Sequence, residues 1–312
     1  MKAKVLVPTL GMEREEWLKH RRRGIGGSDA AAIAGLNPWK SPVEVYYEKL
    51  GEIPPVEDNE RMYWGRVLED IVAREFSKRT GKRVRRRNAI LQHPKHGFMI
   101  GNIDRELVGE KVGLECKTVG EYSKDDWKED RVPEQYIIQC QHYMAVTGYG
   151  GWWIAALIGG NKFVYKYIER DDVIISALIE LESQFWDMVQ SQTPPPMDGT
   201  DSAGNVLKLM YPESKPNTAI NLPNEAAELI EIREALKVQV KELDMRLAET
   251  ENKLKAMLGD NESGRVGEHL ITWKTIVSNR VDTKKLKEKH LDVYRECCQE
   301  SSYRRFNIKR RA

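Results

Sequence analysis

The stretch GNIDRELVGEKVGLECKT, residues 101–118, decides the fold of this chain. It predicts a β-hairpin, with one strand over 101–108, a turn over 109–111 and a return strand over 112–118. Because side chains alternate along a strand, Glu115 and Lys117 project from the same face of the return strand. The hairpin therefore presents an acid and an amine side by side.

Asp104, on the first strand, brings a second carboxylate to this hairpin. Two carboxylates and an ammonium on one sheet face are costly unless a divalent cation bridges the acids. With Lys117 beside an attacking water, the set is that of a metal-assisted phosphodiester site. Taken alone, the pattern D-x10-E-x-K is more often a charged, solvated strand face, so its interpretation as a metal site depends on the flanking segments.

Two predicted helices carry further polar pairs at helical spacing. Residues 60–80 form an amphipathic helix. Its stripe and edges comprise Trp64, Leu68, Ile71, Val72, Glu75 and Phe76. Gly65 and Glu69 stand one turn apart on this helix, and a glycine there lets a backbone or a phosphate approach closely. Gln139 and Tyr143 have the same spacing on a helix from Pro133 to about Thr147, although a plain amphipathic edge gives such pairs too.

The segment before residue 35 contains a candidate anion site. A helix over 14–23 ends in three arginines, and a glycine-rich turn over 24–27 follows it. Ser28 and Asp29 then cap an alanine-rich helix, so Ser28 with the free amides of this turn predicts a phosphate seat. Arg21 is the best match for an arginine that clamps the same phosphate, although Asp29 would repel it unless it points away. A plain helix cap is the alternative interpretation.

Composition describes a globular protein rather than a membrane or disulfide-rich one. The chain has 312 residues, of which 40% are hydrophobic and 31% charged, and its net charge is +2. Basic runs occur at 21–23, 82–87, 304–305 and 309–311. The four cysteines form no CxxC, the apolar run within Met1 to Pro8 is too short for a signal peptide, and no window spans a membrane. We expect a soluble protein in a reducing compartment.

The remaining pattern predicts an α/β domain followed by a helical appendage. Further helices are expected over 43–50 and 172–192, and further strands over 83–90, 152–158 and 163–168. The proline run 194–196 marks a boundary, giving domains 1–196 and 197–312. In the second domain, apolar residues repeat at seven from about 222 to 258, before a strand over 269–277, a helix over 286–300 and a basic tail. The heptad helix either packs within the chain or mediates oligomers.

The order of these motifs resembles that of the PD-(D/E)XK nucleases of the RecB and lambda-exonuclease type, and in detail the YqaJ-like phage recombinases. The resemblance covers roughly residues 10–190. It is carried by RRRGIGGSDAA at 21–31, GRVLE at 65–69, IGNID at 100–104, LECKT at 114–118 and QCQHYMAVTG at 139–148. One departure is that Asn102-Ile103, rather than a proline, precedes the aspartate.

The resemblance implies a role for each motif residue. Asp104 and Glu115 would bind the catalytic metals together with the Cys116 backbone carbonyl, and Glu69 would contribute from its helix. Because these ligands are all hard oxygens, Mg²⁺ is implied, with Mn²⁺ able to substitute, and zinc is disfavoured. Lys117 would orient the water, while Gln139 and Tyr143 would support the site or contact the DNA backbone. Arg21 and Ser28 would hold the 5′-terminal phosphate.

The resemblance also implies an α/β core with a central mixed sheet flanked by helices, and a reaction. The expected activity is metal-dependent digestion of double-stranded DNA from ends, 5′ to 3′. It would leave 3′ single-stranded overhangs for an annealing protein of the RecT type. A trimer is expected by analogy, in the cytoplasm of a bacterial host and encoded by a phage or prophage. The alternatives are an endonuclease cutting internally or on branched DNA, and a non-catalytic DNA-binding or scaffolding protein.

Overall fold

The computed structural model describes residues 3–310 and divides the chain into two compact units. The first unit ends at Pro212 and the second begins at Glu213. The terminal residues 1–2 and 311–312, which include part of the predicted basic tail, lie outside the described residues. The motif residues all belong to the first unit.

The first unit is built on a five-stranded sheet with the strand order β2-β5-β6-β7-β8. These strands are β2 (Val84–Arg86), β5 (Arg105–Leu107), β6 (Val112–Val119), β7 (Gly151–Ile158) and β8 (Lys162–Glu169). The β6–β7 pair is parallel and the other pairs are antiparallel, which confirms the predicted mixed sheet. A smaller sheet contains β1 (Lys4–Pro8), β3 (Ala89–Gln92) and β4 (Ile100–Gly101).

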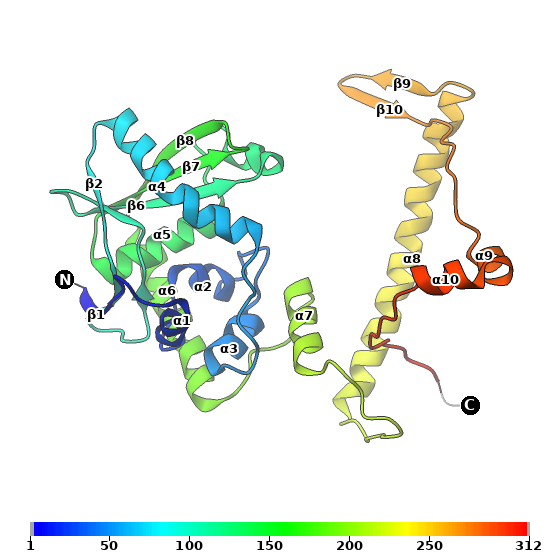
Figure 1. The fold of residues 1–312 in the computed structure, drawn as a ribbon, viewed down its shortest axis with the longest axis horizontal. Helices are drawn as coiled ribbons and strands as arrows, with labels where there is room; N and C mark the ends of the chain where they lie inside the picture. The colour runs from blue at the N-terminus through cyan, green and yellow to red at the C-terminus, as the bar shows by residue number, and fades with distance from the viewer. Residues whose placement is uncertain (1–2, 311–312) are drawn as a thin grey trace. The chain divides into compact units, whose positions relative to one another are not determined.

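Helices cover both faces of the five-stranded sheet (Figure 1). On one face α4 (Glu60–Thr80) packs Val72 and Phe76 against Leu114 of β6. On the other face α5 (Glu134–Thr147) packs Met144 against Trp152 of β7. Behind α5 lie α2 (Gly27–Ile33), α3 (Pro42–Leu50) and α6 (Asp172–Ser191), while α1 (Arg14–Arg21) and a short 3₁₀ helix, η1 (Glu121–Trp127), complete the unit up to residue 191.

The predicted strand over 101–108 is broken, and Asp104 lies at the break. Gly101 ends β4, which pairs with β3, whereas Arg105 begins β5, which pairs with β6. The β5–β6 ladder stops at the pair Arg105–Leu114, so the next outward amide of β6 lacks a strand partner. The Asp104 carboxylate accepts that amide, Cys116 N–H, at 2.8 Å. Asp104 therefore lies in a bend beside the sheet and not within a strand.

The helix predicted over 60–80 is confirmed as α4, but part of its predicted stripe is wrong. The Asn59 side chain caps its start and Gly81, at φ +70°, ends it. Trp64 and Ile71 are exposed: Trp64 precedes the part of the helix that packs on the sheet, and Ile71 lies outside the packed face formed by Val72 and Phe76. The first half borders a groove, where Arg66 pairs with Asp58 and Glu69 with Arg105.

The helix α7 (Asp201–Met210) extends the first unit beyond residue 196. Val206 is buried in the cluster formed by α2, α3 and α6. Ser202 accepts the Ser41 N–H at 2.9 Å and donates to Glu44. The sequence analysis placed this segment in the second domain, yet its buried residues Ser202, Ala203 and Val206 belong to the first unit.

The second unit consists of a long helix and short elements. These are α8 (Glu225–Leu258), β9 (Ser263–Val266), β10 (His269–Thr272), α9 (Thr283–Lys289) and α10 (Leu291–Cys297). The long helix confirms the predicted heptad segment, whereas the helix expected over 286–300 is two helices. Among its described residues, Leu258 is the only buried hydrophobic one. No helix within residues 3–310 is both long and apolar enough to cross a membrane.

Candidate active site

The two carboxylates of the hairpin meet at the point where β5 and β6 diverge. Glu115 is buried, with its side chain 4% exposed, and its Oε2 atom has no hydrogen-bond partner among the described residues. Asp104 is half-buried and turns its Oδ2 to the Cys116 amide. Burial, followed by repulsion from Glu115 and Glu69, raises the pKa of Asp104 well above its usual value. The nearby Lys117 therefore does not offset the burial and the acidic neighbours of Asp104.

Lys117 and Gln139 complete the face that the sequence predicted. Lys117 Nζ lies 2.6 Å from Glu115 Oε1 and donates to Gln139 Oε1 at 3.0 Å. Gln139 in turn donates to Glu115 Oε1 at 2.8 Å and to the Tyr143 hydroxyl at 3.0 Å. Burial opposes the charge of Lys117, but Glu115 and Asp104 outweigh it and raise the pKa of the ammonium. Lys117 is consequently a cation and not a base.

Glu69 lies near these residues but is bound elsewhere. Arg105, which is buried, donates to Glu69 and Asp70 from its two terminal nitrogens. This arginine follows Asp104 directly, so the same bend that presents the aspartate also fixes the glutamate. A Cβ at Gly65 would meet only Thr118 Oγ1 at 3.8 Å, so packing within the protein does not require glycine there.

The residues present fit a magnesium-type ion. No three His, Cys, Asp or Glu side chains in the described chain are grouped closely enough to hold a metal by themselves. Asp104 and Glu115 nevertheless give two carboxylates, and Mg²⁺ in phosphate-processing sites is usually held by one or two carboxylates plus water and substrate oxygens. The buried, unpartnered Glu115 Oε2 is the observation that favours a cation, because such an atom is costly when left unsatisfied.

A groove of about 870 Å³ runs over this set of residues. Glu69, Asp104, Glu115 and Lys117 line its floor. Its walls include three arginines and two tryptophans: Arg14, Arg61, Arg66, Trp17 and Trp39. The Arg61 guanidinium lies 5.2 Å from the centroid of the Trp39 ring. Asp58 lines the groove as well and pairs with Arg14 and Arg66. The arginines still outnumber it, and basic and aromatic walls beside the two carboxylates suit a polyanion whose cleavage needs a metal.

Arg21 and Ser28 open onto the same acidic pair. A cavity of about 180 Å³ is lined by Arg21, Gly26, Gly27 and Ser28 on one side and by Asp104, Glu115, Gln139 and Tyr143 on the other. The Arg21 Nη2 atom lies 3.3 Å from Ser28 Oγ, and Ser28 is exposed. A Cβ at Gly27 would lie 2.7 Å from the Tyr143 ring, so glycine is required where α2 approaches α5.

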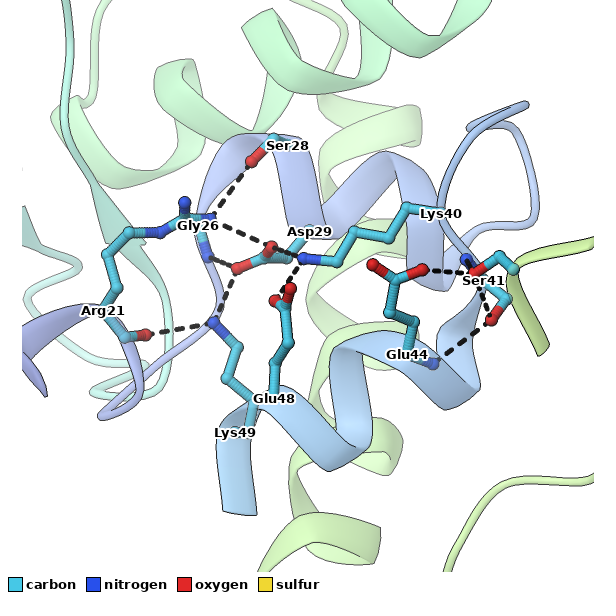
Figure 2. Close-up of polar contacts among 10 residues, drawn as sticks. Arg21, Gly26, Ser28, Asp29, Lys40, Ser41, Glu44, Glu48 and Lys49 are labelled. Atoms are coloured by element: carbon cyan, nitrogen blue, oxygen red, sulfur yellow. Dashed lines mark hydrogen bonds and ion pairs between the residues drawn. The ribbon is translucent and has the colours of Figure 1, made fainter. Parts of the chain in front are cut away.

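Asp29 is turned away from that cavity, which resolves the conflict seen in the sequence. It is fully buried and pairs with Arg21 at 3.1 Å, Lys40 at 3.2 Å and Lys49 at 2.6 Å (Figure 2). Burial opposes its charge, but the three cations outweigh it and hold the pKa of Asp29 well below its usual value. Asp29 is also the third residue of α2 and accepts the Gly26 N–H at 3.2 Å. The helix cap is therefore Gly26, and not Ser28 as predicted.

Lys49 fixes Arg21 from the main chain as well. Its ammonium donates to the Arg21 carbonyl at 3.0 Å, and burial lowers its pKa to about 8. Lys40 also pairs with Glu48. Sequence reasoning missed Arg105, Lys40 and Lys49, because their partners are distant in the chain. Only the adjacency of Arg105 to Asp104 was visible as a signal.

The mixed sheet and its acidic face define a fold of the PD-(D/E)XK type. An alkaline exonuclease from Laribacter hongkongensis has a similar structure, with a TM-score of 0.50 and 21% identity over 57% of this chain and 94% of that one. At this identity the likeness shows the fold alone.

Sequence relatives then give the family. The family model described as the YqaJ-like viral recombinase domain matches residues 16–150. The uncharacterized protein YqaJ of Bacillus subtilis (strain 168) is 46% identical over 312 residues, which is 99% of this chain and 98% of that protein. The chain belongs to the YqaJ-like viral recombinase family. A more distant relative, the uncharacterized protein R354 of Acanthamoeba polyphaga mimivirus, is 24% identical over 45% of this chain and 28% of its own length.

Proposed function

We propose that this protein is a Mg²⁺-dependent exonuclease that digests double-stranded DNA from ends, 5′ to 3′, and leaves 3′ single-stranded overhangs. The observation that carries the proposal is that one cavity joins Arg21 and Ser28 to Asp104 and Glu115. The anion site lies directly beside a carboxylate pair of the kind that binds a metal. This arrangement fits a DNA strand whose terminal phosphate binds at the anion site while its next phosphodiester bond is cut.

Asp104, Glu115 and the Cys116 carbonyl are the proposed ligands. A bound Mg²⁺ would neutralise charge on the scissile phosphate and lower the pKa of the attacking water. Lys117, whose raised pKa keeps it charged, would orient the attacking water and offset the negative charge that develops on the phosphate. Gln139 keeps Lys117 and Glu115 in fixed orientation, and Tyr143 supports Gln139 from the same helix. Glu69 would join the ligands only after leaving Arg105.

The groove and the cavity give substrate binding. Arg14, Arg61 and Arg66 line the groove, where they would contact the backbone phosphates of the duplex. Arg21 presents a planar guanidinium to the terminal phosphate, while Asp29 holds that guanidinium in place. The family assignment to viral recombinases supports a role in recombination. We infer that a single-strand annealing protein of the RecT type receives the overhangs.

The proposal is tested by comparing DNA substrates in the presence of Mg²⁺. The substrates are linear duplex with 5′-phosphate ends, the same duplex with 5′-hydroxyl ends, and covalently closed circular DNA. We expect loss of both linear substrates, faster from 5′-phosphate ends, and no cutting of the circle. Labelling each strand separately gives the polarity.

Two variants separate the parts of the proposal. Glu115→Gln is expected to abolish cleavage of every substrate, and Arg21→Met to reduce the preference for 5′-phosphate ends. Cutting of closed circles would instead favour an endonuclease. DNA binding without cleavage by the wild-type protein would favour a non-catalytic role.

A further inference from the structure

The long helix α8 of the second unit carries an apolar seam that no described residue covers. In a heptad register, Leu229, Leu236, Leu243 and Met257 occupy d positions, and Val240, Leu247 and Leu254 occupy a positions. These side chains are between 37% and 82% exposed. Most of the stability of a helix in a protein comes from packing its apolar face, so α8 requires a partner.

Two polar residues interrupt the seam, and their placement is symmetric. Arg233 stands at an a position and Thr250 at a d position. Arg233 lies as far from Glu225, the first residue of α8, as Thr250 lies from Leu258, its last residue. When two copies of α8 lie antiparallel with their ends aligned, Arg233 of each copy therefore lies opposite Thr250 of the other.

We propose that two copies of this chain associate through α8 as an antiparallel two-stranded coiled coil. In this register each a position faces a d position of the second copy. The pairs are Leu229 with Leu254, Arg233 with Thr250, Leu236 with Leu247 and Val240 with Leu243, each repeated by the two-fold axis. The small Ala226 faces the long Met257. All seam leucines thus bury against an apolar residue.

Charge at the edges of the seam agrees with this orientation. Lys237 and Asp244 occupy e positions, and the antiparallel register brings Lys237 of each copy beside Asp244 of the other. A parallel pair would instead set Arg233 directly against Arg233 inside the seam, where two like charges repel with little water to screen them. The antiparallel register contains no such like-charge pair among its e and g positions.

The chain's own C-terminal segment does not replace the second copy. The Phe306 ring lies 5.9 Å from the Arg233 guanidinium and is itself 80% exposed. That contact touches the seam at its polar interruption, and Leu236 and Leu243 remain 52% and 60% exposed. At about 1.5 Å per residue, the 34 residues of α8 give a seam of about 51 Å, which is longer than most intramolecular helix contacts.

The first test is the oligomeric state of the full chain, measured by light scattering across a dilution series. Leu243→Lys places a charge in the seam, whereas Met245→Lys places the same charge on the outer face at matched exposure, 60% against 59%. We expect wild type and Met245→Lys to associate in multiples of two. Leu243→Lys should raise the dissociation constant roughly 100-fold or more. Circular dichroism of all three proteins checks that α8 stays helical.

The second test is orientation, using oxidation to form disulfides. Cys297 and Cys298 are exposed and are first replaced by serine. In that background, Arg233→Cys combined with Thr250→Cys should crosslink two chains, and Arg233→Cys alone should not. Crosslinking by Arg233→Cys alone would show a parallel pair. A wild-type monomer at high concentration, or a trimer that Leu243→Lys leaves intact, would overturn the proposal. None of these readouts depends on nuclease activity.

Discussion

At the scale of single residues, Gln139 holds the two oppositely charged groups of the site together. Its amide oxygen accepts from Lys117, and its amide nitrogen donates to Glu115 and Tyr143. Only one orientation of the amide satisfies all three partners: its nitrogen faces the Glu115 carboxylate and its oxygen faces the Lys117 ammonium. A hydrophobic residue there would leave the Lys117–Glu115 ion pair without the amide that orients both groups.

We predict that Gln139→Ala lowers cleavage roughly 10- to 100-fold, the usual effect of losing a side chain that orients a metal ligand. Gln141, two residues on in α5, is the matched control. It is equally buried but bonds to the Glu169 carbonyl and the Asp171 amide, away from the site. Gln141→Ala should cost stability, with turnover per folded molecule unchanged. Equal loss of turnover in both variants would show that Gln139 acts only through folding.

At the scale of elements, a buried pair joins α5, α6 and β4. His142 and Glu182 are both fully buried, and their side chains lie 2.8 Å apart. The other ring nitrogen of His142 lies 2.8 Å from the Ile100 carbonyl of β4, so it donates there. Burial opposes a charge on His142, but Glu182 outweighs it and raises the pKa of the imidazole. Burial also raises the pKa of Glu182. Above the pKa of an unfolded histidine, the folded pair therefore keeps a proton that the unfolded residues would release, whether it lies on His142 or on Glu182.

This pair predicts a pH dependence of stability. Its contribution is fully present below about pH 6.5, the unfolded pKa of histidine, and is lost as pH rises through the raised folded value. The loss amounts to about 1.4 kcal/mol for each unit of pKa shift. Urea unfolding of wild type and Glu182→Gln from pH 6 to 8 measures it, with the exposed Glu180→Gln as control. The difference in the free energy of unfolding between wild type and Glu182→Gln should become smaller as pH rises. A constant difference would contradict the prediction.

Elements with local signals were predicted, and those set by distant contacts were not. The helix α4 was predicted to its ends from its amphipathic pattern, and in the structure Asn59 and Gly81 cap those ends. The break at Asp104 depends on where β4 and β5 find their partners, which no local pattern contains. The helix α7 was missed because it follows a proline-rich boundary signal, and its place in the first unit depends on the contact of Val206 with the cluster formed by α2, α3 and α6.

At the scale of the whole molecule, the sequence located the candidate site better than its surroundings. Glu115 and Lys117 lie on one strand face, as their spacing predicted, and Gln139 contacts both, as the family resemblance implied. The direction of Asp29 was left open, because its partner Lys49 comes from a different helix. Periodicity fixes which face a side chain occupies, whereas ion pairs between elements follow only from the packed fold.

The last prediction concerns where the first unit ends. A chain of residues 1–212 should fold and retain cleavage of linear ends, because every candidate site residue lies within it. A chain of residues 1–196 lacks α7 and should be about 2–5 kcal/mol less stable than 1–212. The loss has two parts: Val206 leaves the cluster beneath α3, and the Ser41 amide and Glu44 lose Ser202. Urea unfolding of the two fragments measures the difference. Equal stability of the two fragments would place the boundary at 196 and make α7 a linker segment. Neither fragment contains α8, so both should lose the association proposed for that helix.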